Sequence, residues 1–99
     1  MINKEEIIRY LRDNRQIFLE KYSVDSFMLF GSFARDENRD KSDIDIVYSL
    51  KKGAKLNFDK YLELEKELQK AFGKKVDLIN QKKLNPLVKL NATKDFIYV

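Results

Sequence analysis

The sequence predicts a small α/β domain of the α+β kind, in which a mixed sheet of about four strands is flanked by helices. Two observations predict it. Amphipathic helical patterns alternate along the chain with short apolar runs of strand length. The composition, with 43% apolar and 36% charged residues, is that of a globular rather than a disordered chain. Since no repeat, low-complexity tract or linker interrupts the pattern, we expect a single domain over residues 1–99.

The first predicted element is an amphipathic helix over residues 3–22. Asn3 can cap its amino end, and Glu6 stands three positions later, as in a capping box. Apolar side chains at helical spacing then form a stripe, which we expect to face the core: Ile7, Leu11, Phe18 and Tyr22, widened by Ile8 and Leu19.

Two further helices are predicted. The first covers residues 58–72, with Asn57 as its cap and Gly73 at the position of a left-handed carboxyl-terminal residue. The second is shorter and covers residues 85–94, because its Asn-Pro start places proline at the favoured first helical position.

Four short apolar segments are predicted as strands, namely residues 26–30, 43–50, 76–79 and 96–99. The last of them is expected at the sheet edge. Between the first two, residues 33–38 could form one helical turn. In the second strand the side chains alternate between the two faces of the sheet: Ile44, Ile46 and Tyr48 on one, Asp43, Asp45 and Val47 on the other.

The residue types that are missing limit the chemistry. The chain has no cysteine and no histidine, which excludes disulfides, thiolate or imidazole metal ligands and a histidine base. A bound metal would need oxygen ligands, which Mg²⁺ or Mn²⁺ prefers. No apolar run reaches the ~20 residues of a membrane span, and no signal-like apolar core follows the N-terminus. We therefore expect a cytoplasmic protein without a membrane partner.

Asp43 and Asp45 form the most unusual pair of the sequence. They occupy alternate positions of an otherwise apolar strand, so both carboxylates project from the same face. Two like charges on a half-buried surface repel each other, and a divalent cation bound to both would remove that cost. An Asp-x-Asp pair is also common at exposed strand starts, where solvent alone stabilises the charges.

Gly31 and Ser32 mark a second candidate site. They follow an apolar strand and precede a predicted helical turn, and a strand–glycine–helix junction presents backbone amides and a helix N-terminus, which attract phosphate. Ser32 adds a hydroxyl donor, and Arg35 could reach phosphate oxygens. The spaced glycines of a Walker A loop are absent, and an ordinary tight turn after a strand would look the same.

Taken together, these residues resemble a known family signature. The stretch Gly31-Ser32-Phe33-Ala34-Arg35 precedes Ser42-Asp43-Ile44-Asp45-Ile46-Val47, and ten residues separate Ser32 from Asp43. This pattern resembles the DNA-polymerase-beta-like nucleotidyltransferase superfamily, and it is most similar to the minimal nucleotidyltransferase (MNT) branch. Members of that branch are often encoded beside a HEPN-domain partner as antitoxins. The resemblance implies the polymerase-beta-like fold.

The resemblance also implies a third carboxylate on a neighbouring strand, and Asp77, within Val76-Asp77-Leu78-Ile79, stands where the family places it. Without the earlier motif, an aspartate on an exposed strand face would be the simpler interpretation. One position departs from the family pattern, since Asp36 follows Arg35 where glycine is frequent. Asp36 would tolerate a positive φ better than most residues, though less well than glycine.

The implied reaction transfers AMP from ATP to an acceptor hydroxyl. Asp43 and Asp45 would bridge two divalent cations, Mg²⁺ or Mn²⁺, and Asp77 would hold the second beside the acceptor. Gly31, Ser32 and Arg35 would hold the terminal phosphates. For the MNT branch, the implied acceptor is a tyrosine of a HEPN-type toxin, and the transfer silences the toxin. The chain could form a homo- or hetero-oligomer.

Two other functions stay open on the sequence. A catalytically weak antitoxin could neutralise its partner by contact alone. A small basic nucleic-acid-binding protein is the other alternative, although a formal net charge of +4 does not indicate a direct nucleic-acid partner without a clear basic stripe. The lysines at 51, 52, 55, 82 and 83 could contact the nucleotide or the partner, or be solvated loop residues.

Overall fold

The computed structural model describes residues 2–84 and 96–99, so the helix predicted over residues 85–94 lies outside the described residues. The described elements, in chain order, are α1 (Lys4–Asp13), α2 (Arg15–Tyr22), β1 (Val24–Phe30), β2 (Ile44–Leu50), α3 (Phe58–Phe72), β3 (Val76–Asn80), the short 3₁₀ helix η1 (Gln81–Lys83) and β4 (Ile97–Tyr98).

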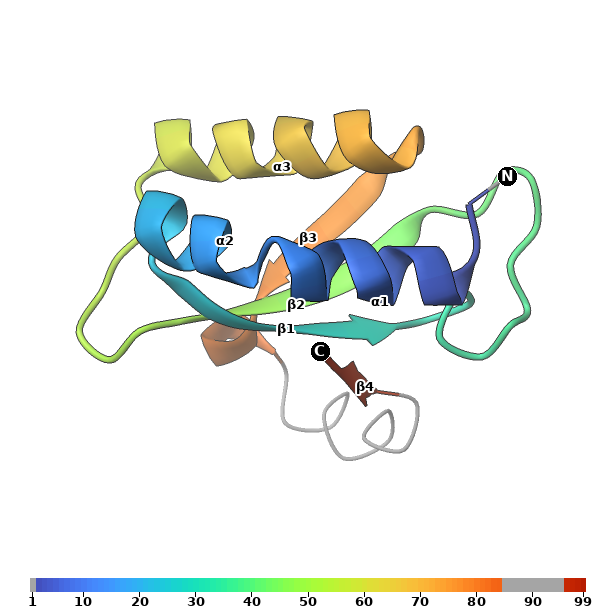
Figure 1. Ribbon diagram of the computed structural model, residues 1–99, viewed down its shortest axis with the longest axis horizontal. Coiled ribbons are helices and arrows are strands. Elements are labelled where there is room, and N and C mark those ends of the chain that lie inside the picture. Colours follow the sequence, from blue (N-terminus) through green and yellow to red (C-terminus); the bar gives the residue numbers. More distant parts are fainter. Residues whose placement is uncertain (1, 85–95) are drawn as a thin grey trace.

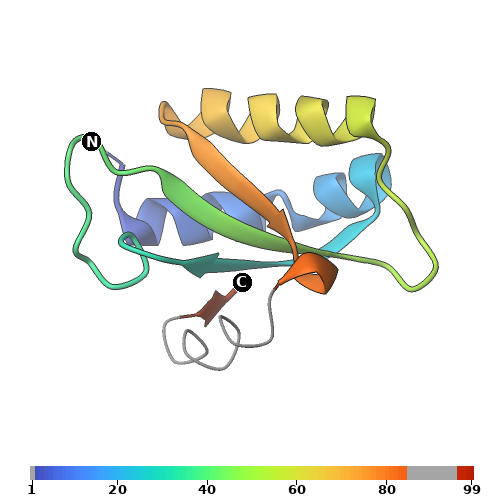
Figure 2. The ribbon, with the colours of Figure 1, turned by 180° about the vertical axis from the view of Figure 1, so that it is seen from behind.

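The strands form one mixed sheet in the order β3-β2-β1-β4. β1 runs antiparallel to both β2 and β4, whereas β2 and β3 are parallel, as expected for two strands joined by the crossover helix α3. α1, α2 and α3 lie on the same face of this sheet (Figures 1 and 2). The predicted fold class and the position of the last strand at the sheet edge are both confirmed.

The two faces of the sheet carry different cores. The larger core lies under the helices and contains Ile44, Ile46 and Tyr48 from β2. A smaller apolar cluster on the other face contains Val47, Met28 and Phe96. The alternation predicted for β2 is therefore confirmed, and Asp45 lies on the face away from the helices.

The prediction of one continuous helix over residues 3–22 is wrong, because the helix is broken at Asn14. The side-chain amide of Asn14 donates to the carbonyl of Tyr10 at 2.9 Å, and its backbone leaves helical geometry with φ −106° and ψ 14°. A side chain that bonds the local backbone competes with the helix at this point. The cap is confirmed, since Asn3 accepts a hydrogen bond from the amide of Glu6, and the predicted stripe is buried.

The ends of α3 agree with the prediction to the residue. Asn57 accepts from the amide of Lys60 at 2.8 Å, and Gly73 adopts φ 69°. No helix in residues 2–84 and 96–99 is long and apolar enough to cross a membrane.

Candidate active site

The site begins where β1 ends. Gly31 follows Phe30 directly and adopts φ 77°, a left-handed conformation that favours glycine. A Cβ built on Gly31 would overlap the Oδ2 atom of Asp45 and lie 3.0 Å from its carboxyl carbon. The antiparallel pairing of β1 with β2 explains this contact, because Phe30 lies opposite Asp45. The two halves of the sequence motif therefore touch, and only a residue without a side chain fits between them.

The turn after Gly31 differs from the predicted helical turn over residues 33–38. The carbonyl of Gly31 accepts from the amide of Arg35 at 3.3 Å, and that of Ser32 accepts from the amide of Glu37 at 2.9 Å. This pattern describes an irregular turn over residues 32–36. Consequently the backbone amides beside Gly31 belong to a turn rather than to a helix N-terminus.

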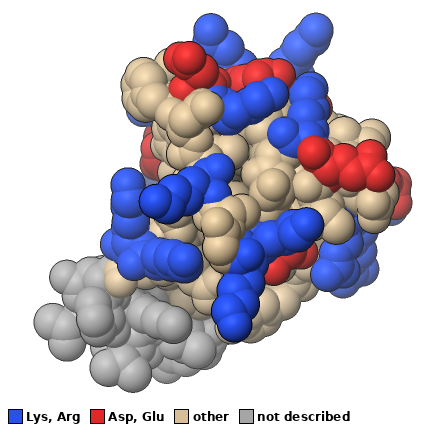
Figure 3. All heavy atoms as spheres, turned by 90° about the vertical axis from the view of Figure 1, so that its left-hand side faces the viewer, with Lys and Arg blue, Asp and Glu red and all other residues tan. Residues whose placement is uncertain are grey.

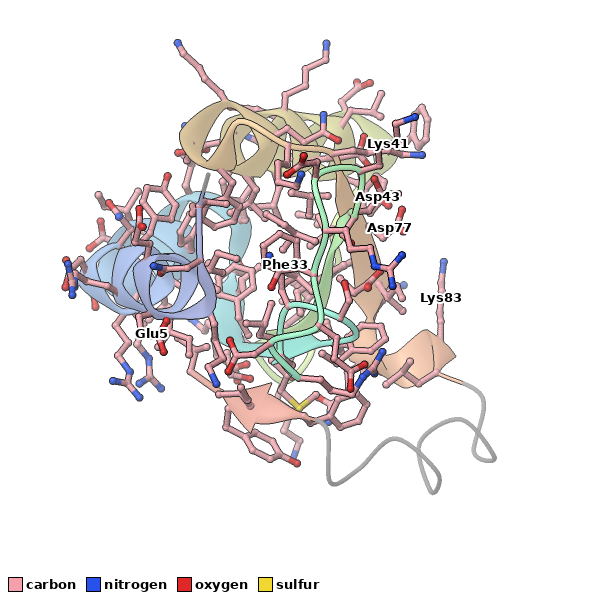
Figure 4. All side chains as sticks on the ribbon, turned by 90° about the vertical axis from the view of Figure 1, so that its right-hand side faces the viewer. Glu5, Phe33, Lys41, Asp43, Asp77 and Lys83 are labelled. Atoms are coloured by element: carbon pink, nitrogen blue, oxygen red, sulfur yellow. The ribbon has the colours of Figure 1, made fainter. Side chains whose placement is uncertain are left out.

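Phe33 anchors this turn. Its ring is fully buried and belongs to the larger core, and Figure 4 shows it pointing inward between the sheet and α1. Ser32 is half-buried beside it, while Arg35 is exposed and its Nε lies 3.1 Å from Oε2 of Glu37. The buried ring fixes the turn so that its other residues stay near the surface.

Asp36 adopts φ 58°, the left-handed conformation considered for it on the sequence. Its carboxylate accepts a hydrogen bond from Nζ of Lys4 at 2.9 Å, so the turn is tied to the start of α1. Lys4 therefore partly neutralises the charge of Asp36 near the expected phosphate site. The hydrogen bond to Asp36 in turn raises the pKa of Lys4.

Asp45 and Asp77 lie side by side, because they are register partners in the parallel pair β2 and β3. The strand predicted from residue 43 begins one residue later, at Ile44, so Asp43 stands just before β2. The amide of the next residue, Ile44, donates to the carbonyl of Lys75 at 2.9 Å. The chain before β2 is therefore held beside the chain before β3, next to Asp43. Asp43 and Asp77 are found at the same rim of the molecule (Figure 4).

The crowding of these carboxylates changes their chemistry. Burial, followed by the charge of Asp77, a hydrogen bond to Asp77 and the charge of Asp43, raises the pKa of Asp45 from 3.8 to about 6. Arg35 acts in the opposite direction, which places its positive charge within reach of Asp45. The structure thus brings Gly31, Asp43, Asp45, Asp77 and Arg35 into one electrostatic neighbourhood.

The donor set matches a hard divalent cation, because it consists of carboxylate oxygens with no nitrogen or sulfur. In the described residues, 2–84 and 96–99, no three acidic side chains are already grouped so as to hold a metal ion. Asp45 and Asp77 instead lie side by side as register partners, and the nearby Asp77 helps to raise the pKa of Asp45. A cation held by these carboxylates would relieve their mutual repulsion.

A family of known proteins matches this chain. The family described as polymerase beta, nucleotidyltransferase, matches residues 5–99. This chain belongs to that family. It is therefore a nucleotidyltransferase by family, as the signature around Gly31 and Asp45 predicted, and the polymerase-beta-like fold is confirmed.

Two sequence relatives illustrate the family. A candidate protein adenylyltransferase of Methanocaldococcus jannaschii is 45% identical over 95 residues, which cover 95% of this chain and 95% of the relative. The protein adenylyltransferase MntA of Thermococcus cleftensis is 29% identical over 99 residues, covering 100% of this chain and 98% of the relative.

Two solved structures have a similar fold. One is a toxin–antitoxin structure with AMP-PNP, with a TM-score of 0.69 and 25% identity, covering 98% of this chain and 72% of that one. The other contains a tri-AMPylated HEPN toxin of Shewanella oneidensis in complex with an MNT antitoxin. Its TM-score is 0.59 at 24% identity, with coverage of 97% and 67%, and this likeness shows the fold alone.

Sequence reasoning missed two contributions to the site. The motif alone does not predict the anchoring role of Phe33, although an apolar residue between a glycine and an arginine in a polar loop indicates a buried anchor. Phe30 was treated as part of a strand, and its position opposite Asp45 depends on a register that the sequence alone does not specify.

Proposed function

We propose that this nucleotidyltransferase transfers AMP from ATP to a tyrosine hydroxyl of a HEPN-type toxin and thereby acts as its antitoxin. Asp43, Asp45 and Asp77 form the catalytic centre of the proposal, and Gly31, Ser32 and Arg35 hold the terminal phosphates. The observation that carries it is the contact of Gly31 with the Asp45 carboxylate, beside Asp77. The names of the relatives support protein as the acceptor and AMP as the transferred group.

The bond changes follow from the reaction class. The acceptor oxygen forms a bond to the α-phosphorus, the bond from that phosphorus to the bridging β-oxygen breaks, and pyrophosphate leaves. Asp77, which stands beside the acceptor in this proposal, would help to draw off the hydroxyl proton.

Gly31 leaves room for the Asp45 carboxylate, because a side chain at this position would overlap it. In the proposal, backbone amides of the turn beside Gly31 bind the phosphate oxygens. Arg35 supplies positive charge on the same side, as its effect on Asp45 indicates. The buried ring of Phe33 keeps the turn in place while phosphates bind and leave.

Mg²⁺ or Mn²⁺, two ions in this proposal, would be held by Asp43, Asp45 and Asp77 and would stabilise charge on the attacking and leaving oxygens. The proposal also includes a cytoplasmic location, where ATP is available, and a single domain over residues 1–99.

The test uses the purified chain, ATP labelled at the α-phosphate, Mg²⁺ and the HEPN-type protein encoded beside it. We expect label on the partner, and none with Asp43→Asn or Asp77→Asn. Asp59→Asn is the matched control, because Asp59 is an exposed aspartate in the first turn of α3 and should leave transfer unchanged. Tight inhibition of the partner without label, equal for all three variants, would instead show that contact alone neutralises it.

A further inference from the structure

A groove of about 460 Å³ lies at the opposite end of the sheet from the aspartates. Lys55, Lys82 and Lys83 line it, together with the polar side chains of Ser49, Asn80 and Gln81. Asp45 is near the start of β2 and Ser49 near its end, so about 13 Å of strand separates the two sites. We call this feature the lysine groove. It takes no part in the proposed reaction.

Both rims of the lysine groove are held by hydrogen bonds from backbone amides. On one rim, the amide of Lys51 donates to the carbonyl of Ser23, and the amide of Ala54 donates to the carbonyl of Lys51, each at 2.9 Å. On the other rim the acceptor is a side chain, since Oδ1 of Asn80 accepts from the backbone amide of Lys82 at 3.0 Å. The lysines are thus presented by fixed backbone rather than by loose chain.

Folding concentrates positive charge here. Lys51 and Lys52 stand on the same loop as Lys55, and all five lysines of the two segments are exposed. Residues 46–58 and 78–84 contain no aspartate or glutamate at all. Figure 3 shows Lys and Arg side chains gathered over this end of the molecule. The basic stripe that is not evident along the sequence is formed by bringing two distant segments together.

An exposed aromatic ring stands next to the stripe. Phe58, the first residue of α3, is 71% exposed and follows Leu56, which lines the lysine groove, by two positions. Leaving a phenylalanine ring in water has no structural benefit, whereas a nucleic-acid base could stack on it. Asp25 lies across from the end of β2, and Asp59 follows Phe58 in the chain. Neither aspartate lines the groove.

We propose that the lysine groove binds single-stranded RNA, with the lysines on phosphates and Phe58 stacked against a base. A fixed basic groove beside an exposed aromatic ring is the arrangement by which single strands are held without sequence preference. An acidic protein surface is less suited, because protein interfaces favour arginine and are depleted in lysine. Half-buried Ser49 supplies a hydroxyl for sugars and base edges.

The experiment measures fluorescence anisotropy of a labelled 12-nucleotide uridine RNA with the full chain. We expect Lys82→Ala/Lys83→Ala to weaken binding by about tenfold and to reduce its salt dependence, since each phosphate contact contributes ~0.7 to the slope. Phe58→Ala should weaken binding by about tenfold, without reducing that slope, through lost stacking. The control Lys66→Ala/Lys70→Ala removes the same charge from exposed positions of α3 and should have little effect.

Equal weakening by the control pair would overturn the proposal, because net charge alone would then explain binding. It would also be overturned if a labelled glutamate peptide of equal charge bound as tightly as the RNA and Phe58→Ala had no effect, which would indicate an acidic protein surface. Transfer of AMP by each variant is measured in parallel. Retained transfer shows that the variant is folded, and separates this proposal from the fate of the proposed function.

Discussion

Replacing Asp45 by asparagine should make the protein more stable while it abolishes transfer. The pKa of Asp45 is raised from 3.8 to about 6, mainly by burial and then by Asp77. The folded state therefore binds more protons than the unfolded state between these two values, and the stability of the wild type falls as the pH rises through that window. Asparagine carries no charge at any of these pH values, and its amide can still donate a hydrogen bond to Asp77.

The magnitude follows from the pKa shift. About two pKa units correspond to about 3 kcal/mol, and solvent screening around this partly exposed side chain reduces the effect to about 1–2 kcal/mol. For a domain of this size, the melting temperature of Asp45→Asn at pH 7 should rise by about 4–10 °C. At pH 4 the folded wild type already holds the proton, so the two proteins should melt at nearly the same temperature.

The assay is thermal unfolding followed by circular dichroism at pH 4 and pH 7, combined with the transfer assay. Asp25→Asn, an exposed position on β1, is the matched control and should change neither stability nor transfer. Loss of a carboxylate that would hold the divalent cations should lower transfer by a factor of about a hundred or more. Two results would refute the explanation by crowded carboxylates. One is a melting temperature of Asp45→Asn below that of the wild type at pH 7, and the other is an equal rise in melting temperature at pH 4 and pH 7.

Three further substitutions test other parts of the structure. Gly31→Ala should lower the free energy of unfolding by about 2 kcal/mol and abolish transfer, because φ is 77° and the added methyl group would meet Asp45. Its control is Gly53→Ala, where φ is 81° and an added Cβ would have no atom within 4 Å. This control should lower the free energy of unfolding by about 1 kcal/mol and keep transfer. Phe33→Ala should cost about 3 kcal/mol or more in chemical denaturation and also impair transfer, since the ring is fully buried under the turn; full transfer would show that the ring does not position it. Tyr22→Phe removes the hydrogen bond from the Tyr22 hydroxyl to Glu67 between α2 and α3 and should cost about 1 kcal/mol with transfer unchanged; an unchanged melting temperature would contradict this.

How much the sequence predicts depends on whether the signal is local. The ends of α3 are predicted to the residue, because a side-chain cap at Asn57 and a left-handed glycine at position 73 both act within one turn. The break between α1 and α2 is missed, since one asparagine interrupts an apolar stripe that continues on both sides. The stripe predicts which face is buried but not whether the helix is continuous.

The site shows the same limit. The sequence predicts Gly31, Asp45 and Asp77 as site residues through their spacing and strand positions, but the contacts between them come from strand pairing. The antiparallel register places Phe30 opposite Asp45, and the parallel register places Asp45 opposite Asp77. A shift of either register by one residue would turn the carboxylates to opposite faces. The lysine groove is harder still to predict, because its two segments are distant in the chain.

Peptide mapping by mass spectrometry tests the central claim most directly. The HEPN-type partner is incubated with the wild-type chain, ATP and Mg²⁺, then digested, and its peptides are searched for the added mass of AMP. The account predicts AMP on a tyrosine of the partner, and unmodified tyrosine when Asp45→Asn replaces the wild type. AMP found with Asp45→Asn at the wild-type level, or no AMP on the partner with the wild-type chain, would contradict it.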